Sequence, residues 1–250
     1  TIYSSESGTT DDGRIVKILA GSWAAARDAT SGSAATVTYS SSASAVNVHR
    51  LSGRRGSTTY GVGRSFFCFD TSGITGTVSA ATIKIQGYSQ NSGSVIAVKS
   101  TAFGGDGGTA LATGDFNAIS GWSSGSSLAS SATTYGPQII TSSWSTSGYN
   151  DFTGTSDLRT DMQNDSVVII CLMDYTHDYL NNALTSDQSN SCGLYYAEQT
   201  GTSRDPAIEY TLAAVGATVH TINTVAEANI AAIKGIAHAN IAEVNTVTFD

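Results

Sequence analysis

Charged side chains are scarce in this sequence. Lys, Arg, Asp and Glu make up 13% of its 250 residues, against about a quarter in an ordinary soluble domain. The formal net charge is −8, whereas proteins that bind the nucleic-acid backbone need a basic face. We therefore expect no nucleic-acid partner and a surface kept soluble by Ser, Thr, Asn and Gly, a composition typical of extracellular or virion proteins.

Long apolar runs are also missing. No stretch approaches the roughly 18 apolar residues that a membrane helix needs, so we expect no membrane partner. The first residues, TIYSSESGTTDDGR, lack the basic and apolar regions of a signal peptide, and we expect no export by that route. Thr1 fits either removal of an initiator Met or processing of a longer precursor.

Cysteine is rare and its spacing is uninformative. Cys68, Cys171 and Cys192 form an odd set without a CxxC pair, which argues against both a disulfide framework and a zinc site. Two of the three lie in apolar runs, so buried, reduced thiols are the simplest interpretation. Such thiols suit folding in a reducing cytoplasm, and we expect no metal and no cofactor.

Short apolar or alternating runs separated by Gly, Ser, Asn and Asp are abundant, and each predicts a strand. They are RIVKIL, ATVTYS, SFFCFD, ATIKIQGY, SVIAVKS, PQIITSSW, DSVVIICLM, CGLYYAE and AIEYTL. Their number and spacing predict an all-β fold, an antiparallel jelly-roll-like sandwich, over residues 35–212. Residues 1–34 are expected to form an extended or partly helical lead-in, residues 155–164 a short helix, and residues 213–250 a separate tail.

Two segments carry a resemblance to a known family. GRSFFCFDTSGITGTVSAATIKIQGYS (63–89) and SRDPAIEYTL (203–212) resemble the strand–turn–strand pattern and the last strand of the DNRLRE-like, carbohydrate-binding-module-like β-sandwiches. The resemblance covers roughly residues 45–212. It implies a jelly-roll sandwich used for surface attachment or glycan binding, and it identifies no binding residues.

The tail repeats itself with an eleven-residue period, from Ile222 to Ile233 to Val244. Two units and a fragment fall short of the roughly three that a repeat array needs to stand alone, so the tail requires a partner. An eleven-residue period can place an apolar stripe along a helix; we favour helical turns interrupted near Gly235, with short strand–turn units as the alternative. The expected partner-binding residues of the tail are Ile222, Val225, Ile230, Ile233, Ile236, Ile241 and Val244.

The same tail resembles the "INGVA.ANI" repeats found in structural proteins of tailed bacteriophages. INTVAEANIAAIKGIAHANIAEVNTV matches in both full units and has Thr or Lys-Gly where Asn-Gly is frequent. The resemblance implies a virion protein, assembled in the host cytoplasm, whose partners are other capsid or tail subunits and copies of itself. A homotrimer is the simplest symmetric assembly that would cover the repeats.

Three groups of residues are candidates for sites. Asp174, His177 and Asp178 could bind a cation or act as an acid and base, although ordinary loop polarity after a strand explains them better. A hairpin around Ser52 and Gly53 would present Arg50, Arg54 and Arg55 to carboxylates of a neighbouring subunit. The aromatic residues that could stack on a sugar, if they are not part of the core, are Trp122, Trp144, Tyr149 and Tyr175.

The sequence contains no nucleophile elbow, HExxH motif, phosphate-binding loop or dinucleotide fingerprint, and we expect no catalytic residues. The function that we expect is therefore that of a non-enzymatic bacteriophage structural protein, either a capsid decoration or a fibre component, tethered by its repeats. The alternative is a glycan-binding host-recognition module of a tail or fibre. A polysaccharide-degrading enzyme ranks last, because linear spacing reveals no facing pair of carboxylates.

Overall fold

The computed structural model describes residues 1–5, 12–37, 44–197 and 201–214, together with four two-residue strands between residues 221 and 237. The chain divides into two compact units, Thr1–Leu212 and Ala213–Asp250. Residues 1–34, expected to be a lead-in, contribute strands and a helix to the first unit.

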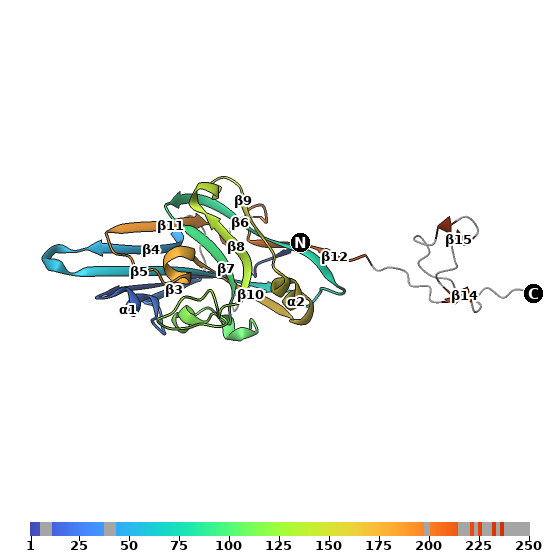
Figure 1. The fold of residues 1–250 in the computed structure, drawn as a ribbon, viewed down its shortest axis with the longest axis horizontal. Helices are drawn as coiled ribbons and strands as arrows, with labels where there is room; N and C mark the ends of the chain where they lie inside the picture. Colours follow the sequence, from blue (N-terminus) through green and yellow to red (C-terminus); the bar gives the residue numbers. More distant parts are fainter. Residues whose placement is uncertain are drawn as a thin grey trace, which may run out of the picture. The chain divides into compact units, whose positions relative to one another are not determined.

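In its described residues the first unit contains 12 strands joined in antiparallel ladders (Figure 1). Hydrogen bonds link them in the order β1-β12-β6-β11-β4-β5-β10-β7-β8, with β9 on β6, β2 on β5 and β3 on β2. Their bounds are β1 (Ile2–Tyr3), β2 (Gly13–Ala20), β3 (Ala34–Val37), β4 (Ser44–Ser52), β5 (Thr58–Asp70), β6 (Val78–Asn91), β7 (Ser94–Lys99), β8 (Thr134–Ile140), β9 (Tyr149–Thr153), β10 (Val167–Asp174), β11 (Gln188–Leu194) and β12 (Ala207–Leu212).

Helices are short and lie between strands. They are α1 (Trp23–Arg27), α2 (Ser156–Asn164), the 3-10 turns η1 (Arg54–Gly56), η2 (Phe103–Gly105), η3 (Thr113–Asn117) and η4 (Thr141–Ser143), and the π-helical turn η5 (Tyr175–Tyr179). The helix expected at 155–164 is confirmed as α2: the Thr155 hydroxyl accepts from the Leu158 N–H, and Leu158 and Met162 are buried. Within the described ranges, no helix has both the length and the apolar character needed to cross a membrane.

The predicted fold class, an all-β antiparallel sandwich, is confirmed. β6, β9 and β12 form one layer, and β5, β10, β7 and β8 form the other. The core between them joins Ile83 and Phe152 from the first layer to Phe67 and Ile170 from the second, each of which is fully buried. Alternation of inward and outward residues along each strand builds this core.

A second core lies on the opposite face of β5, β10 and β7. Phe66 of β5 and Cys171 of β10 pack there against residues of the loop between β7 and β8, among them Phe103, Phe116 and Leu128. The central strands are therefore buried on both faces, which explains why DSVVIICLM is an unbroken apolar run rather than an alternating one. The loop between β7 and β8 acts as a third layer.

The three cysteines are buried and none forms a disulfide. Burial raises the pKa of Cys68 to about 11 and that of Cys192 to about 12. Neutral thiols of this kind behave as small apolar side chains, as the sequence predicts.

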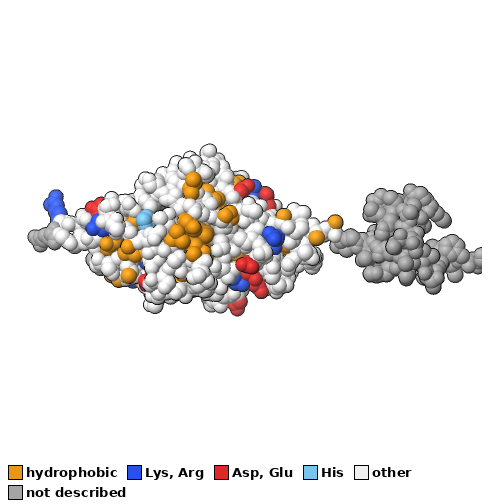
Figure 2. Space-filling model, in the orientation of Figure 1, with side chains coloured by type: hydrophobic (Ala, Val, Ile, Leu, Met, Phe, Trp, Pro, Cys, Tyr) orange, Lys and Arg blue, Asp and Glu red, His pale blue; other side chains and the backbone are white. Residues whose placement is uncertain are grey.

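Few charged side chains are visible on the face of the first unit shown in Figure 2. Most of this face consists of backbone and uncharged polar side chains, with small apolar patches between them. This face agrees with the low charged content of the sequence.

From residue 221 onward, the described residues of the tail lie in strands. β13 (Thr221–Ile222) pairs with β14 (Val225–Ala226), and β15 (Ala232–Ile233) pairs with β16 (Ile236–Ala237). The helical interpretation is therefore wrong for these eight residues. β-branched Ile and Val lie in these strands, and their preference for strand geometry outweighs the helical period of the sequence.

The hairpins reproduce the eleven-residue period of the sequence. Their register pairs Ile222 with Val225 and, eleven residues later, Ile233 with Ile236. In both hairpins, large apolar residues thus form the paired positions that are closer together in the sequence. Three further predicted partner-binding residues, Ile230, Ile241 and Val244, lie outside the described residues.

Candidate functional site

The cluster Asp174, His177 and Asp178 is engaged in holding the loop after β10. Asp174 ends that strand, and its Oδ1 accepts the His177 backbone N–H at 2.7 Å. Burial raises the pKa of Asp174 to about 6. The His177 ring contacts the Asn182 carbonyl oxygen at 2.7 Å and the Gln188 side chain at 3.1 Å, so these side chains are committed to local structure.

Asp178 forms a buried ion pair with an arginine that the sequence analysis did not single out. The Nε and Nη2 of Arg64 each donate to the Asp178 carboxylate at 2.7 Å, and both side chains are fully buried. Nη1 of Arg64 donates to the Phe116 carbonyl oxygen at 2.6 Å, and Nε of Arg27 donates to the Asp178 carbonyl oxygen at 2.8 Å. This network ties β5 and α1 to the loop layer.

Trp122, one of the predicted sugar-stacking residues, belongs to the same network. The guanidinium carbons of Arg27 and Arg64 lie 4.6 and 4.4 Å from its ring centroid. Trp144 is 4% exposed and its indole N–H donates to the Gly193 carbonyl oxygen. Tyr175 is half-buried and stacks on Tyr179. The structure therefore uses these three residues in packing.

The arginine hairpin forms where expected, between β4 and β5. Arg50 pairs with Asp187 of the same chain at 2.6 Å rather than being left open. Arg54 lies exposed on η1, and the side chain of Arg55 is outside the described residues. Across the ranges that the structure describes, no group of three or more His, Cys, Asp or Glu side chains could hold a metal ion.

The fourth predicted aromatic residue, Tyr149, lines a hollow on the outer face of the β9–β6–β12–β1 layer. The hollow has a volume of about 400 Å³, within the roughly 300–1,000 Å³ of typical small-molecule sites. Its lining consists of Thr1, Tyr3, Lys84, Tyr149, Gly201, Thr202, Ser203, Ala207 and Glu209.

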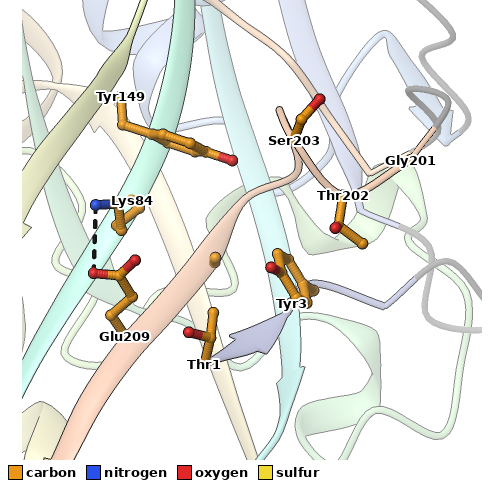
Figure 3. Close-up of a pocket in the computed structure, with 9 residues that line it drawn as sticks. Thr1, Tyr3, Lys84, Tyr149, Gly201, Thr202, Ser203 and Glu209 are labelled. Carbon is orange, nitrogen blue, oxygen red and sulfur yellow. Dashed lines mark ion pairs between the residues drawn. The ribbon is translucent and has the colours of Figure 1, made fainter.

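Strand register explains why this part of the sheet is hollow. Asp151, Lys84, Ala207 and Tyr3 face one another in a row across β9, β6, β12 and β1. Ala207 carries only a methyl group, so space remains between the longer side chains of Lys84 and Tyr3. Tyr149 and Tyr3 stand at opposite sides of this space, as Figure 3 shows.

The side chains of the hollow are held by neighbouring groups. The Tyr149 hydroxyl donates to the Asp205 carbonyl oxygen at 3.1 Å. Lys84 Nζ lies 5.4 Å from the Tyr149 ring centroid, 3.4 Å from Glu209 Oε2 and 3.7 Å from Asp151 Oδ2. Burial raises the pKa of Tyr149 above its ordinary value, so its hydroxyl stays neutral at physiological pH.

A second hollow, of about 420 Å³, offers a comparison. It is lined in part by Lys99 and Asp165, and Lys99 Nζ lies 2.9 Å from Asp161 Oδ2 and 3.7 Å from Asp165 Oδ2. Tyr135 also lines it, but this residue is 1% exposed and its hydroxyl donates to Asp161. The second hollow thus has a lysine between two carboxylates without an accessible aromatic ring.

Sequence reasoning identified Tyr149 and missed its partners. The alternation in ATIKIQGY and AIEYTL indicates that Lys84 and Glu209 each lie on the outer face of a strand. The two residues come together because β12 pairs with β6. These strands lie more than 100 residues apart, so nothing near either residue in the sequence indicates the contact.

No protein-family model matches this sequence, and a comparison with curated proteins finds no match either.

Proposed function

We propose that this protein is a non-enzymatic structural component of a bacteriophage particle, in which the C-terminal repeats tether a displayed β-sandwich. The observation that carries this proposal is the pair of hairpins in the tail, which recur at the eleven-residue period of the sequence. Each described strand of these hairpins is two residues long. An isolated two-stranded hairpin is marginally stable at best in water, and we propose that contacts with neighbouring chains stabilise these hairpins.

Copies of the same chain are the simplest source of those contacts. Repeated supersecondary units bury their apolar residues against neighbouring units, and closed symmetric assemblies do so without leaving open ends. We therefore propose a homotrimer held together by the repeats, which also attach the protein to capsid or tail subunits. The resemblance of the repeats to those of tailed-phage proteins supports this context.

The first unit has the properties of a displayed domain. It is a separate compact unit ending at Leu212, and it contains two cores of its own. The residues that were candidates for acid–base chemistry, Asp174 and Asp178, are buried in structural interactions. These features support a role in display rather than in catalysis.

A host-recognition role is the second candidate, and the hollow at Tyr149 is the observation that favours it. Small-molecule sites combine aromatic side chains with a few convergent polar groups, and this hollow offers both. In this role the repeats would still serve as the anchor.

Light scattering coupled to size-exclusion chromatography tests the tethering proposal. The full chain should have the mass of a trimer, and a chain ending at Leu212 should have the mass of a monomer with its β-sheet circular dichroism retained. An unchanged number of subunits after removal of residues 213–250 would contradict the proposal.

A further inference from the structure

The aromatic residues of the hollow at Tyr149 are placed for contact with a flat ligand. The bond from the Tyr149 hydroxyl to the Asp205 carbonyl oxygen fixes the ring before anything binds, and Tyr3, on the other side of the hollow, is 42% exposed. Aromatic faces carry partial negative charge and attract the polarised C–H groups of a ligand ring. Because Tyr149 is already ordered, binding costs it little conformational entropy.

The polar groups beside these rings combine one donor and one acceptor. The Lys84 ammonium group can only donate hydrogen bonds and the Glu209 carboxylate can only accept them, and the two lie 3.4 Å apart. Neighbouring hydroxyl groups on a ligand can satisfy both, because a hydroxyl donates and accepts. Thr202 and Ser203 add further hydroxyls at the rim (Figure 3).

The charge around the hollow argues against an anionic ligand. Lys84 is shared between Glu209 at 3.4 Å and Asp151 at 3.7 Å, which leaves one net negative charge among the three groups. The whole chain, with these three groups included, carries a formal charge of −8. A ligand that carries a carboxylate or phosphate would meet repulsion here, whereas an uncharged polyhydroxyl compound would not.

We propose that this hollow binds one ring of a neutral saccharide. The C–H face of the sugar packs on Tyr149, adjacent hydroxyls bind Lys84 and Glu209, and Tyr3 closes the opposite side. This proposal deepens the host-recognition role by naming the ligand class, and it is independent of how the tail assembles. Its failure would therefore leave the tethering proposal unaffected.

A glycan array probed with the full chain is the first test. The array carries neutral oligosaccharides, built from hexoses and N-acetylhexosamines, and acidic ones that contain uronic or sialic acid. Binding should occur on neutral glycans and be absent from acidic ones. A blank array, or binding confined to acidic glycans, overturns the proposal.

Variants then locate the binding by titration calorimetry with the neutral oligosaccharide that gives the strongest array signal. Tyr149→Ala should weaken binding at least about tenfold, and Tyr149→Phe, which keeps the ring but loses the hydrogen bond to Asp205, should weaken it clearly less. Lys84→Gln should weaken binding, whereas Lys99→Gln, which changes a lysine held between two carboxylates at the second hollow, should not.

The same variants are checked for folding and assembly. Each should keep the wild-type thermal midpoint to within a few degrees and the wild-type mass in light scattering. Equal affinity of Tyr149→Ala and wild type would overturn the proposed site, and so would equal loss in the Lys84 and Lys99 variants.

Discussion

Replacing Asp178 by Asn should destabilise the sandwich more than replacing an exposed charged residue does. The Asp178 carboxylate accepts two bonds of 2.7 Å from Arg64, and neither side chain is exposed to water. In Asn one of those two oxygens becomes an amino group that faces another donor. The substitution therefore leaves the buried Arg64 charge without its counterion.

The size of the effect follows from that burial. Removing one partner of a buried ion pair costs about 3–5 kcal/mol, and each kcal/mol lowers the unfolding midpoint of a domain of this size by roughly 2–4 °C. Asp178→Asn should thus unfold roughly 6–20 °C below wild type in differential scanning calorimetry. The double variant Arg64→Met/Asp178→Leu should recover part of the loss, because it removes the Arg64 charge together with its partner, and Arg27 keeps its ion pair with Asp28 at 2.6 Å.

Asp187→Asn is the matched control. Asp187 also pairs with an arginine, Arg50, at 2.6 Å, but its side chain is 49% exposed. Exposed ion pairs contribute little to stability, so this variant should unfold close to wild type. Equal midpoints for the Asp178 and Asp187 variants would refute the assignment of the Arg64–Asp178 pair as a structural centre of the fold.

Two further predictions concern backbone strain and pH. Gly121 and Gly125 both have positive φ, 78° and 72°, but an added Cβ would overlap the Ser131 carbonyl oxygen only at Gly121. In urea unfolding, Gly125→Ala should cost about 1–2 kcal/mol, and Gly121→Ala should cost more. Equal losses of stability in the two variants would contradict this. Burial raises the pKa of Asp174 from 3.8 to about 6 in the folded protein. The protonated carboxyl group therefore contributes fully to the free energy of unfolding below pH 3.8, and this contribution is lost as the pH rises through 6. Asp174→Asn keeps an acceptor for His177, and its stability relative to wild type should increase between pH 4 and 7. A stability difference between the two proteins that does not depend on pH would disprove the raised pKa of Asp174.

The strands could be predicted from the sequence because their signals are local. Each of the nine predicted runs coincides with or overlaps a strand, from RIVKIL in β2 to AIEYTL in β12. β9 (YNDFT) was missed because its pattern contains a single large apolar core residue, Phe152. Its assignment as a strand depends on pairing with β6, which lies more than 60 residues earlier.

The sites were harder to predict because they depend on contacts between distant segments. Arg64 lies next to the apolar run of β5, and nothing near it in the sequence indicates that Asp178, 114 residues later, neutralises it. Trp122 and Trp144 could be placed in a binding site or in the core from sequence alone. The burial of Trp144 and the contacts of Trp122 with Arg27 and Arg64 decide for packing. In the tail, the eleven-residue period fits a helix or a repeated hairpin equally well, and the chain adopts hairpins.

The tethering account is tested most directly in the full chain, by changing residues of the hairpins without removing the tail. One variant combines Ile222→Ser, Val225→Ser, Ile233→Ser and Ile236→Ser, which alter the large apolar register pairs. Its control combines Thr221→Ser, Ala226→Ser, Ala232→Ser and Ala237→Ser in the same strands. Light scattering should give a trimer for the wild type and the control and a monomer for the first variant; a trimer in all three, or a monomeric wild type, would contradict the account.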